Sequence, residues 1–567
     1  MVFKSPFPDV PPLPDQNIHN FIFDKDRIPA EDYVVHIDAL TGEKRTRDEF
    51  LDRVRLAATA LCQPRPEGPG IDGGRDIVGI LSHNSLDYIT LVHSLLALAT
   101  PIALLSAYAT AYELGYALRT SKATCLFVGP DLYSVARQAA SEVGIPEERI
   151  FVLQGRVKGK KSLADFIDDA RERRLPIVPT RPAKRDTLAY LVFSSGTTGL
   201  PKAVMVTHGN IAFAQMQNTI CLQVSGAVMP DYPLISLAFL PFYHTYGLHC
   251  LCLRGWWTPT TFVILPKWDV ELVLRLIPQY RMHVLYMIPS ALHQLAYSNR
   301  LRPQDFATVF SIISGAAHLP PALAEFFKKA IKAGPEFAVS NGFGMSEVTI
   351  SATRQPSPEL LDGRISAVPG SAGVLLPGME GKVVREDGTE AGVNEQGELW
   401  LRGGNVVPGY WGNEEATRKT FCDSWLKTGD QFKVDELGRL FFVERAKDTL
   451  KVSGMQVAPT EIEALILAHP EDLVVDACVA GVSGGRTSDE KVPRAWVVLS
   501  ERGHKIGRRE ALRKLDEWAK QNLSKYKWLR GGIAAIDEIP KSPTGKVLRR
   551  TLQEWHESER RKPSARL

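Results

Sequence analysis

Short apolar runs alternate with stretches of helical periodicity through most of the chain. Each run is bounded by a glycine, a proline or a polar turn, which is typical of buried strands. Four such runs stand at residues 76–84, 123–129, 283–289 and 309–315. A helix is expected to follow the first run from Ser85 and the last from near Pro320. This strand-turn-helix order predicts an α/β fold of stacked sheets with helices on both faces.

The pattern changes after about Gly370. Three short apolar runs are separated by glycine turns: GKVVREDG at 381–388, GELWLRGG at 397–404 and GRLFFVE at 438–444. Short strands with glycine turns between them favour a small antiparallel, barrel-like piece. We expect this piece to complete a large N-terminal domain.

A smaller unit is expected after about Lys447. Its pattern predicts a helix, two strands and a second helix at residues 459–469, 477–482, 495–499 and 508–523. Together they make an α+β domain of roughly 120 residues. The sequence thus divides into an N-terminal domain over 1–446 and a C-terminal domain over 447–567.

Composition and charge narrow the class of protein. The 567 residues are 44% apolar and 23% charged, a globular composition in a chain too long for one ordinary core. The net charge of +4 is small, so we expect no nucleic-acid partner, because nucleic-acid-binding domains carry a concentrated basic face. The seven cysteines include no CxxC pair, which favours reduced thiols and offers no zinc site.

Two segments concern membrane insertion and the cellular compartment of the protein. Residues 88–105 are the most membrane-like stretch, yet they include Thr90, His93 and Pro101, so a buried helix followed by a strand is expected and no membrane span. The triplet Ala565-Arg566-Leu567 is similar to the peroxisomal address Ser-Lys-Leu. It predicts a peroxisomal import receptor as a partner; the alternative is a frayed polar tail and a cytoplasmic location.

One loop carries the clearest chemistry. A strand ending at Phe193 leads into SSGTTGLPK at 194–202. Glycines let the backbone approach a ligand closely, and successive amides, hydroxyls and a lysine can donate to phosphate oxygens. The kinase-type P-loop, GxxxxGK[ST], is excluded because Pro201 and Ala203 flank Lys202. On these residues alone, polyphosphate binding and a flexible surface loop both remain open.

Eight motifs, in order, carry a resemblance that spans nearly the whole chain. They are SSGTTGLPK (194–202), PFYHTYG (241–247), SGAAHL (314–319), NGFGMSE (341–347), GELWLRGGNVVPGYWGN (397–413), WLKTGD (425–430), ERAKDTLKVSGMQVAPTEIE (444–463) and PKSPTGKVLRR (540–550). The chain resembles the acyl-adenylate-forming superfamily of acyl-CoA synthetases, adenylation domains and beetle luciferases. The resemblance is greatest to its 4-coumarate–CoA ligase branch.

The resemblance implies a first half-reaction in which a carboxylate attacks the α-phosphate of ATP, with Mg²⁺, to form an acyl-adenylate. The residues it assigns to the phosphates are Ser194, Ser195, Gly196, Thr197, Thr198, Gly199 and Lys202. Ser346 would add a hydroxyl, and Glu347 would bind Mg²⁺, which prefers hard carboxylate ligands. Lys546 would bridge the substrate carboxylate and the α-phosphate and offset their mutual repulsion. Thr197, Glu347, His244 and Lys546 form the implied catalytic set.

The resemblance also assigns the nucleoside contacts. The residues beside adenine would be Gly315, Ala316, Asn341, Gly342 and Phe343. Asp430 would accept hydrogen bonds from the ribose hydroxyls, with Arg445 in support.

The second half-reaction would pass the acyl group to CoA. The resemblance implies that the C-terminal domain is mobile and swings about a hinge near Lys447. The residues lining the thiol entry would be Lys447, Lys451, Gly454 and Gln456, and Lys267 could also serve CoA. At the acyl end, His244 would act as a gate and Tyr246 as a wall, with Ser314 and Val348 beside them; core packing is the alternative for His244 and Tyr246.

Four positions and one segment depart from the family pattern. At one of these positions, Ser346 replaces the commoner threonine and keeps the hydroxyl. Ala203 stands where a glycine usually follows the loop lysine, and Glu444 replaces the usual hinge aspartate. Ser453 stands where plant ligases have a lysine near CoA, which puts that contact in doubt. The continuation after Glu347, VTISATRQP, differs from that of many coumarate ligases.

The sequence therefore predicts an ATP-dependent carboxylic acid–CoA ligase for an aryl, cinnamate-like acid or a medium- or long-chain fatty acid. Stand-alone loading of a carrier protein is an alternative, although no carrier-type serine motif follows Lys546. A luciferase-like oxidase is a second alternative. A non-catalytic interaction protein is a third, and the retained Lys202, Glu347, Asp430 and Lys546 speak against it.

Overall fold

Two compact units make up the chain. Unit 1 comprises residues 1–107, 117–193 and 203–444, and unit 2 comprises 108–116, 194–202 and 445–567. The computed structural model describes all residues except 29–30, 195–199, 226–229, 297, 299, 317–318, 320, 332–336, 357–359, 361–362, 386, 446–449, 453–454, 458, 485–490, 541–548 and 562–567.

The first sheet has six strands in the order β7-β6-β4-β5-β8-β9. Their bounds are β4 Val78–Leu81, β5 Ile102–Leu105, β6 Cys125–Val128, β7 Ile150–Val152, β8 Leu188–Ser194 and β9 Lys202–Thr207. β4 pairs in parallel with β5 and β6. Helix α3 (Leu86–Ala97) is buried along its whole length, and the Ser85 side chain caps it by accepting from the Tyr88 amide. The predicted strand-turn-helix at 76–97 is therefore confirmed, as is the helix and strand predicted at 88–105.

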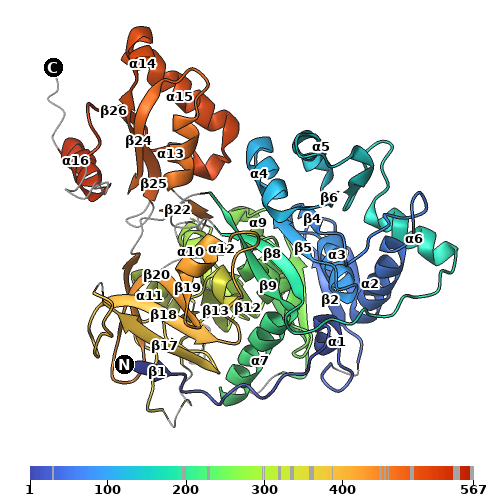
Figure 1. Ribbon diagram of the computed structural model, residues 1–567. Coiled ribbons are helices and arrows are strands. Elements are labelled where there is room, and N and C mark those ends of the chain that lie inside the picture. The colour runs from blue at the N-terminus through green and yellow to red at the C-terminus, as the bar shows by residue number, and fades with distance from the viewer. Residues whose placement is uncertain are drawn as a thin grey trace. The chain divides into compact units, whose positions relative to one another are not determined.

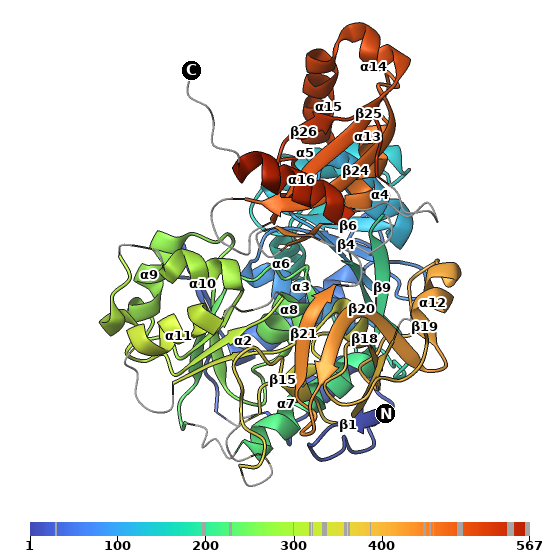
Figure 2. The ribbon, with the colours of Figure 1, turned by 90° about the vertical axis from the view of Figure 1, so that its left-hand side faces the viewer.

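The second sheet has seven strands in the order β14-β13-β12-β10-β11-β2-β3. Their bounds are β2 Val34–Asp38, β3 Lys44–Thr46, β10 Leu234–Ala238, β11 Thr260–Ile264, β12 Val284–Met287, β13 Ser311–Ser314 and β14 Ala338–Asn341. Only β2 and β3 pair in antiparallel fashion; the other neighbours run parallel. Helices α9 (Val270–Gln279), α10 (Pro289–Ala296) and α11 (Pro321–Ala330) gather together beside it (Figure 2). The helix expected near Pro320 is thus α11.

Asn84 ties the first sheet to the second. It lies between β4 and α3, and its Nδ2 donates to the carbonyls of Leu240 at 2.9 Å and Ala238 at 3.3 Å. Its Oδ1 accepts from the amide of Phe242 at 3.0 Å. One buried side chain therefore satisfies the backbone that follows β10, which leads into the aromatic-histidine motif.

The third sheet of unit 1 is antiparallel, as predicted. Its strands are β1 (Val2–Lys4), β17 (Met379–Val384), β18 (Gly397–Gly403), β20 (Trp425–Val434) and β19 (Phe421–Cys422), in that order, with β21 (Leu440–Arg445) paired to β20. Figure 1 shows β17, β18 and β20 side by side. β1 was not predicted, because the proline-rich N-terminal segment shows no alternation; its pairing with β17 forms it.

Unit 2 contains the predicted α+β arrangement. β24 (Val474–Ser483) pairs antiparallel with β25 (Lys491–Leu499), which pairs parallel with β26 (Ile533–Ala535). Helices α13 (Pro459–Leu467) and α15 (Arg508–Asn522) share one apolar core with the inner face of this sheet. A hairpin of β22 (Leu450–Val452) and β23 (Met455–Val457) precedes α13, and α14 (Glu501–Ile506) and α16 (Arg549–Arg561) complete the unit. In the part of the chain that the structure describes, no helix has the length and apolar character to cross a membrane.

Three buried histidines share an aromatic cluster in unit 1. His36 of β2 and His93 of α3 both contact the ring of Phe50, with centroids 5.1 and 5.5 Å away. His19, in α1 (Ile18–Ile22), lies 6.3 Å from His93. Burial lowers the pKa of His19 to about 3 and that of His93 to about 4, and it lowers the pKa of His36 well below the ordinary value. All three are therefore neutral at pH 7.

We predict that the free energy of unfolding of unit 1 falls as pH falls from 6.5 toward 4. A buried neutral histidine takes up a proton on unfolding in this window, so the unfolded state binds more protons and acid favours it. Replacing His36 by Leu removes one group that takes up a proton on unfolding. The slope of the free energy of unfolding against pH then becomes shallower by about 1.4 kcal/mol per pH unit. Urea unfolding followed by tryptophan fluorescence at pH 7.5, 6.0 and 5.0 measures the slope; a slope equal to that of the wild type would contradict the assignment.

Candidate active site

Glu347 lies in a short turn at the centre of the site. The turn is the 3₁₀ helix η5 (Ser346–Val348), and Glu347 is only 5% exposed. The hydroxyl of Tyr410 donates to Oε1 of Glu347 at 3.0 Å. Burial, and then the negative charge of Glu347, raise the pKa of Tyr410 far above its usual value, so the phenol keeps its proton. A buried carboxylate is thus held by a permanent donor.

The loop that follows β18 holds the backbone of this turn. The amide of Val407 donates to the carbonyl of Glu347 at 3.0 Å. Thr349 has φ +68°, a strained value for a β-branched residue, and its Oγ1 donates to the carbonyl of Asn405 at 2.6 Å. Asn405 in turn donates to the carbonyls of Val348 and Ser351 at 3.2 and 3.0 Å. Hydrogen bonds from the loop that follows β18 therefore stabilise the conformation of the turn.

The adenine-side segment leaves β14 and runs beside residues 352–355. The amide of Phe343 donates to Oγ1 of Thr353 at 2.9 Å, and Gln355 donates to Oδ1 of Asn341 at 2.8 Å. Gly342 admits no larger residue, since a Cβ there would lie 2.4 Å from the carbonyl oxygen of Thr353. Close backbone packing thus explains the glycine.

Phe343 lies against the strand that carries Asp430. Its ring contacts Phe432 of β20 edge to face, with centroids 4.9 Å apart. Asp430 is two residues earlier on the same strand and therefore on the same face, and it is 4% exposed. Its amide donates to Oγ1 of Thr428 at 3.1 Å. The structure thus brings the predicted base and ribose residues together.

Tyr246, Ser314 and Gly315 also come together, at the end of β13. The hydroxyl of Tyr246 donates to the carbonyl of Ile313 at 2.9 Å, and a Cβ on Gly315 would lie 3.2 Å from the Tyr246 ring. Ser314 is 1% exposed, and its Oγ has no hydrogen-bond partner among the described residues. Ala316 follows with φ +65°. The Ser314 hydroxyl, which has no partner among the described residues, thus lies near the Tyr246 ring. A polar atom near an aromatic ring is compatible with the predicted acyl end of the site.

His244 precedes α8 (Thr245–Gly247), which leads into a buried π-helical turn, η3 (Leu248–Leu253). Burial lowers the pKa of His244 to about 4, so its ring is neutral at pH 7. A Cβ on Gly247 would lie 2.2 Å from the carbonyl oxygen of Pro241, which explains the glycine of this motif. Val348 is fully buried in the apolar cluster of the third sheet, with Leu401 and Leu426 among its members.

The phosphate loop is described at its two ends. Ser194 ends β8 and Lys202 begins β9. A strand starts at the lysine, which confirms that the loop is not a kinase-type P-loop, where a helix would start there. The next helix, α7 (His208–Val224), is capped instead by the Thr207 side chain. The predicted residues outside the described part are Ser195, Gly196, Thr197, Thr198 and Gly199.

The predicted thiol-side residues belong to several elements. Lys451 in β22 and Gln456 in β23 are directly paired across the hairpin. Arg445 ends β21, and its side chain is outside the described part. Lys267 is exposed between β11 and α9, and its charge is the second cause, after burial, of a lowered pKa at His83. The predicted residues Lys447, Gly454 and Lys546 and the triplet 565–567 also lie outside the described part of the chain.

One residue of the C-terminal lysine motif, Arg549, binds α16 to other elements of unit 2. Arg549, the first residue of α16, donates to both carboxylate oxygens of Glu463, at 2.8 and 3.1 Å. The same carboxylate accepts the amide of Val479 of β24 at 2.7 Å. The sequence analysis gave no role to Arg549, Glu463, Asn405 or Tyr410. All four lie within the motifs quoted above. Only their contacts in the structure show what they do.

The donor set fits Mg²⁺. The described residues include no cluster of three or more side chains that could hold a metal, and Glu347 supplies one hard carboxylate. One carboxylate together with substrate phosphates is how Mg²⁺ is commonly bound beside nucleotides. Glu347 would hold the cation, whose charge would neutralise phosphate oxygens.

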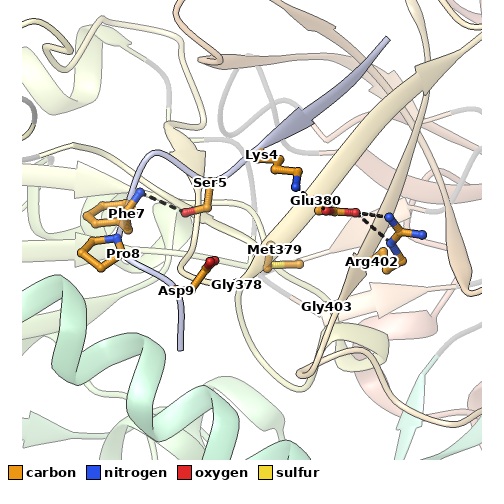
Figure 3. A pocket seen from close by; sticks show the side chains of 10 residues that line it. All are labelled: Lys4, Ser5, Phe7, Pro8, Asp9, Gly378, Met379, Glu380, Arg402 and Gly403. Atoms are coloured by element: carbon orange, nitrogen blue, oxygen red, sulfur yellow. Dashed lines mark hydrogen bonds and ion pairs between the residues drawn. The ribbon is translucent and has the colours of Figure 1, made fainter. Parts of the chain in front are cut away.

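A pocket of about 540 Å³ lies elsewhere in unit 1 (Figure 3). It lies between the N-terminal segment and strands β17 and β18, and Glu380 on its wall is paired with Lys4 and Arg402. None of the predicted site residues lines it. It is therefore separate from the candidate active site.

Comparison with known proteins identifies the family of the chain. The AMP-binding enzyme family model matches residues 28–411, and the model of the AMP-binding enzyme C-terminal domain matches 461–546. A probable 4-coumarate–CoA ligase of Dictyostelium discoideum is 31% identical, with 98% of each chain covered. An acyl-CoA ligase of Alternaria alternata is 29% identical, covering 98% of this chain and 97% of the relative.

Solved structures share the fold. o-Succinylbenzoate CoA synthetase from Bacillus subtilis superposes with a TM-score of 0.74 at 24% identity, covering 95% of this chain and 98% of that one. ATP-bound MatB from Rhodopseudomonas palustris gives a TM-score of 0.65 at 25% identity, covering 96% and 99%. The mixed α/β N-terminal domain and small C-terminal domain are thus those of this fold. The chain belongs to the AMP-binding, adenylate-forming enzyme family, among its AMP-forming acyl-CoA ligases.

Proposed function

We propose that this protein joins a carboxylic acid to CoA in two half-reactions, with ATP and Mg²⁺. The observation that carries the proposal is the buried Glu347 carboxylate held by Tyr410. The same unit also brings Phe343 beside the strand of Asp430. These groups supply a carboxylate for a phosphate-bound cation, an aromatic ring for a base and an acceptor for ribose hydroxyls.

In the first half-reaction the substrate carboxylate attacks the α-phosphorus of ATP, and pyrophosphate leaves. Two anions repel each other during this attack, so the protein's contribution is mainly positive charge placed in advance. We assign the β- and γ-phosphates to the loop 194–202 and to Ser346, and the bridge between carboxylate and α-phosphate to Lys546. Asp430, with Arg445 in support, would orient the ribose.

In the second half-reaction the CoA thiol attacks the acyl carbonyl, and AMP leaves. We propose a domain boundary at 446/447, with a hinge near Lys447 about which the C-terminal domain turns. The thiol entry would then be lined by Lys447, Lys451, Gly454 and Gln456, with Lys267 toward CoA. His244, neutral at pH 7, would gate the acyl end without adding charge.

The proposed acid is aryl, cinnamate-like, or a medium- or long-chain fatty acid. The rings of Tyr246 and Tyr286 meet edge to face at 6.5 Å beside Ser314, whose hydroxyl has no partner among the described residues. Similarity to probable 4-coumarate–CoA ligases supports the aryl choice. An aromatic wall accepts a flat ring through stacking or edge contacts.

We predict that pyrophosphate is released from ATP and Mg²⁺ only with a suitable acid, and that Lys546→Ala lowers this rate by about 10²–10³-fold, the cost of one lost electrostatic contact to the reacting centre. A panel of aryl acids and saturated fatty acids, tested with and without CoA, gives both the substrate and the acceptor. Acyl-CoA is the expected product.

Lys505→Ala, at an exposed lysine of α14, is the matched control and keeps the wild-type rate. Pyrophosphate release without acyl-CoA would favour carrier loading, and light emission or oxygen uptake would favour the oxidase. ATP binding without pyrophosphate release from any acid would contradict the proposal and favour a non-catalytic protein.

We also predict that Asp430→Asn raises the KM for ATP at least tenfold, because hydrogen bonds to a charged acceptor are stronger than those to a neutral one. The variant should at the same time lose most of the preference for ATP over 3′-deoxy-ATP. Steady-state pyrophosphate release with both nucleotides measures this preference. Asp423→Asn, at an exposed turn, is the control; an unchanged preference in Asp430→Asn would remove Asp430 from the ribose site.

A further inference from the structure

The loop after β18 contacts the Glu347 turn through both backbone and side chain. The amide of Val407 donates to the carbonyl of Glu347, and the hydroxyl of Tyr410 donates to Oε1 of its carboxylate, each at 3.0 Å. The side chain and the main chain of one residue are thus fixed by positions 407 and 410 of the same loop. The hydrogen bond to Oε1 restricts the orientations that the carboxyl group can adopt.

The same loop is bound to strand β9 on its other side. The amide of Trp411 donates to the carbonyl of Ala203 at 2.8 Å, and the amide of Met205 donates to the carbonyl of Gly409 at 3.0 Å. Asn210 at the start of α7 adds bonds to the carbonyls of Gly404 and Val406 at 3.0 and 3.1 Å. The position of Tyr410 is therefore set by a strand and a helix.

Tyr410 is itself well fixed. It is 6% exposed, and its ring contacts Phe421 edge to face with centroids 5.8 Å apart. Its amide donates to Oγ1 of Thr417 at 3.0 Å. A rigid phenol directed at a carboxylate can orient that carboxylate, whereas a mobile one could not.

We propose that Tyr410 is a positioning residue for magnesium: its hydroxyl holds the Glu347 carboxylate in the orientation that receives the cation carried by ATP. This inference rests on the proposed function, which assigns the cation to Glu347. Tyr410 makes no contact with nucleotide or metal in this scheme and acts through Glu347 alone. Its loss should therefore change the dependence on Mg²⁺ and leave metal-free ATP binding unchanged.

The first test compares Tyr410→Phe with Tyr133→Phe. Tyr133 is a matched control, because it is 9% exposed and its hydroxyl also donates to a glutamate, Oε1 of Glu147, at 3.3 Å. Calorimetry measures ATP binding with Mg²⁺ and with EDTA. We expect Tyr410→Phe to weaken binding about tenfold with Mg²⁺, the size of one hydrogen bond to a charged group, and to leave the EDTA value unchanged. Tyr133→Phe should match the wild type in both.

Equal losses in Mg²⁺ and in EDTA, or an unchanged Mg²⁺ value, would overturn the role of Tyr410. Wild-type protein whose ATP binding ignores Mg²⁺ would overturn the assignment of the cation as well, so the two failures are distinguishable.

A second measurement keeps the hydroxyl of Tyr410 in place. With 3-fluorotyrosine at position 410, the ¹⁹F resonance should shift on adding ATP with Mg²⁺ and not on adding ATP with EDTA. The same label at position 133 should not respond to Mg²⁺. A resonance at position 410 that ignores Mg²⁺ would overturn the proposal.

Discussion

The site depends on the hydrogen bond from the hydroxyl of Tyr410 to the buried carboxyl group of Glu347. Glu347 is 5% exposed, and an unpaired ion in such a place costs several kcal/mol of folding free energy. The hydroxyl of Tyr410 offsets part of that cost, and a hydrogen bond to a charged group contributes about 1.5–3 kcal/mol. The residue is therefore stabilised enough to fold and remains suited to a ligand.

The backbone directly after the Glu347 turn is strained. Thr349, with φ +68°, reverses the chain directly after η5, and a relaxed threonine would not stay in that conformation. Its hydroxyl donates to the carbonyl of Asn405, and Nδ2 of Asn405 donates to the carbonyl of Val348 beside it. The base-side segment is likewise built on close packing, where Gly342 leaves space for the carbonyl of Thr353. Rigidity at these points positions groups before any substrate arrives.

The elements that were predicted from the sequence have local signals. The apolar run at 76–84 and the capping serine before 86 give β4 and α3, and the glycine-bounded runs after 370 give the antiparallel sheet. The site residues came from motifs, and contacts within unit 1 group Phe343 with the strand of Asp430, and Tyr246 with Gly315. β1 was missed because it is a strand only by pairing with β17, some 380 residues away. Tyr410 and Asn405 were missed because hydrogen bonds across about 60 residues leave no local pattern.

In the proposed function, the side chain of Glu347 serves adenylation. Acid-dependent exchange of labelled pyrophosphate into ATP reports that half-reaction without CoA, and Glu347→Gln keeps the shape of the side chain while removing its charge. We expect that the variant folds, still binds ATP in EDTA, and loses exchange by about 10²–10³-fold, the usual cost of one electrostatic contact to the reacting phosphates. Exchange at the wild-type rate in Glu347→Gln would contradict it.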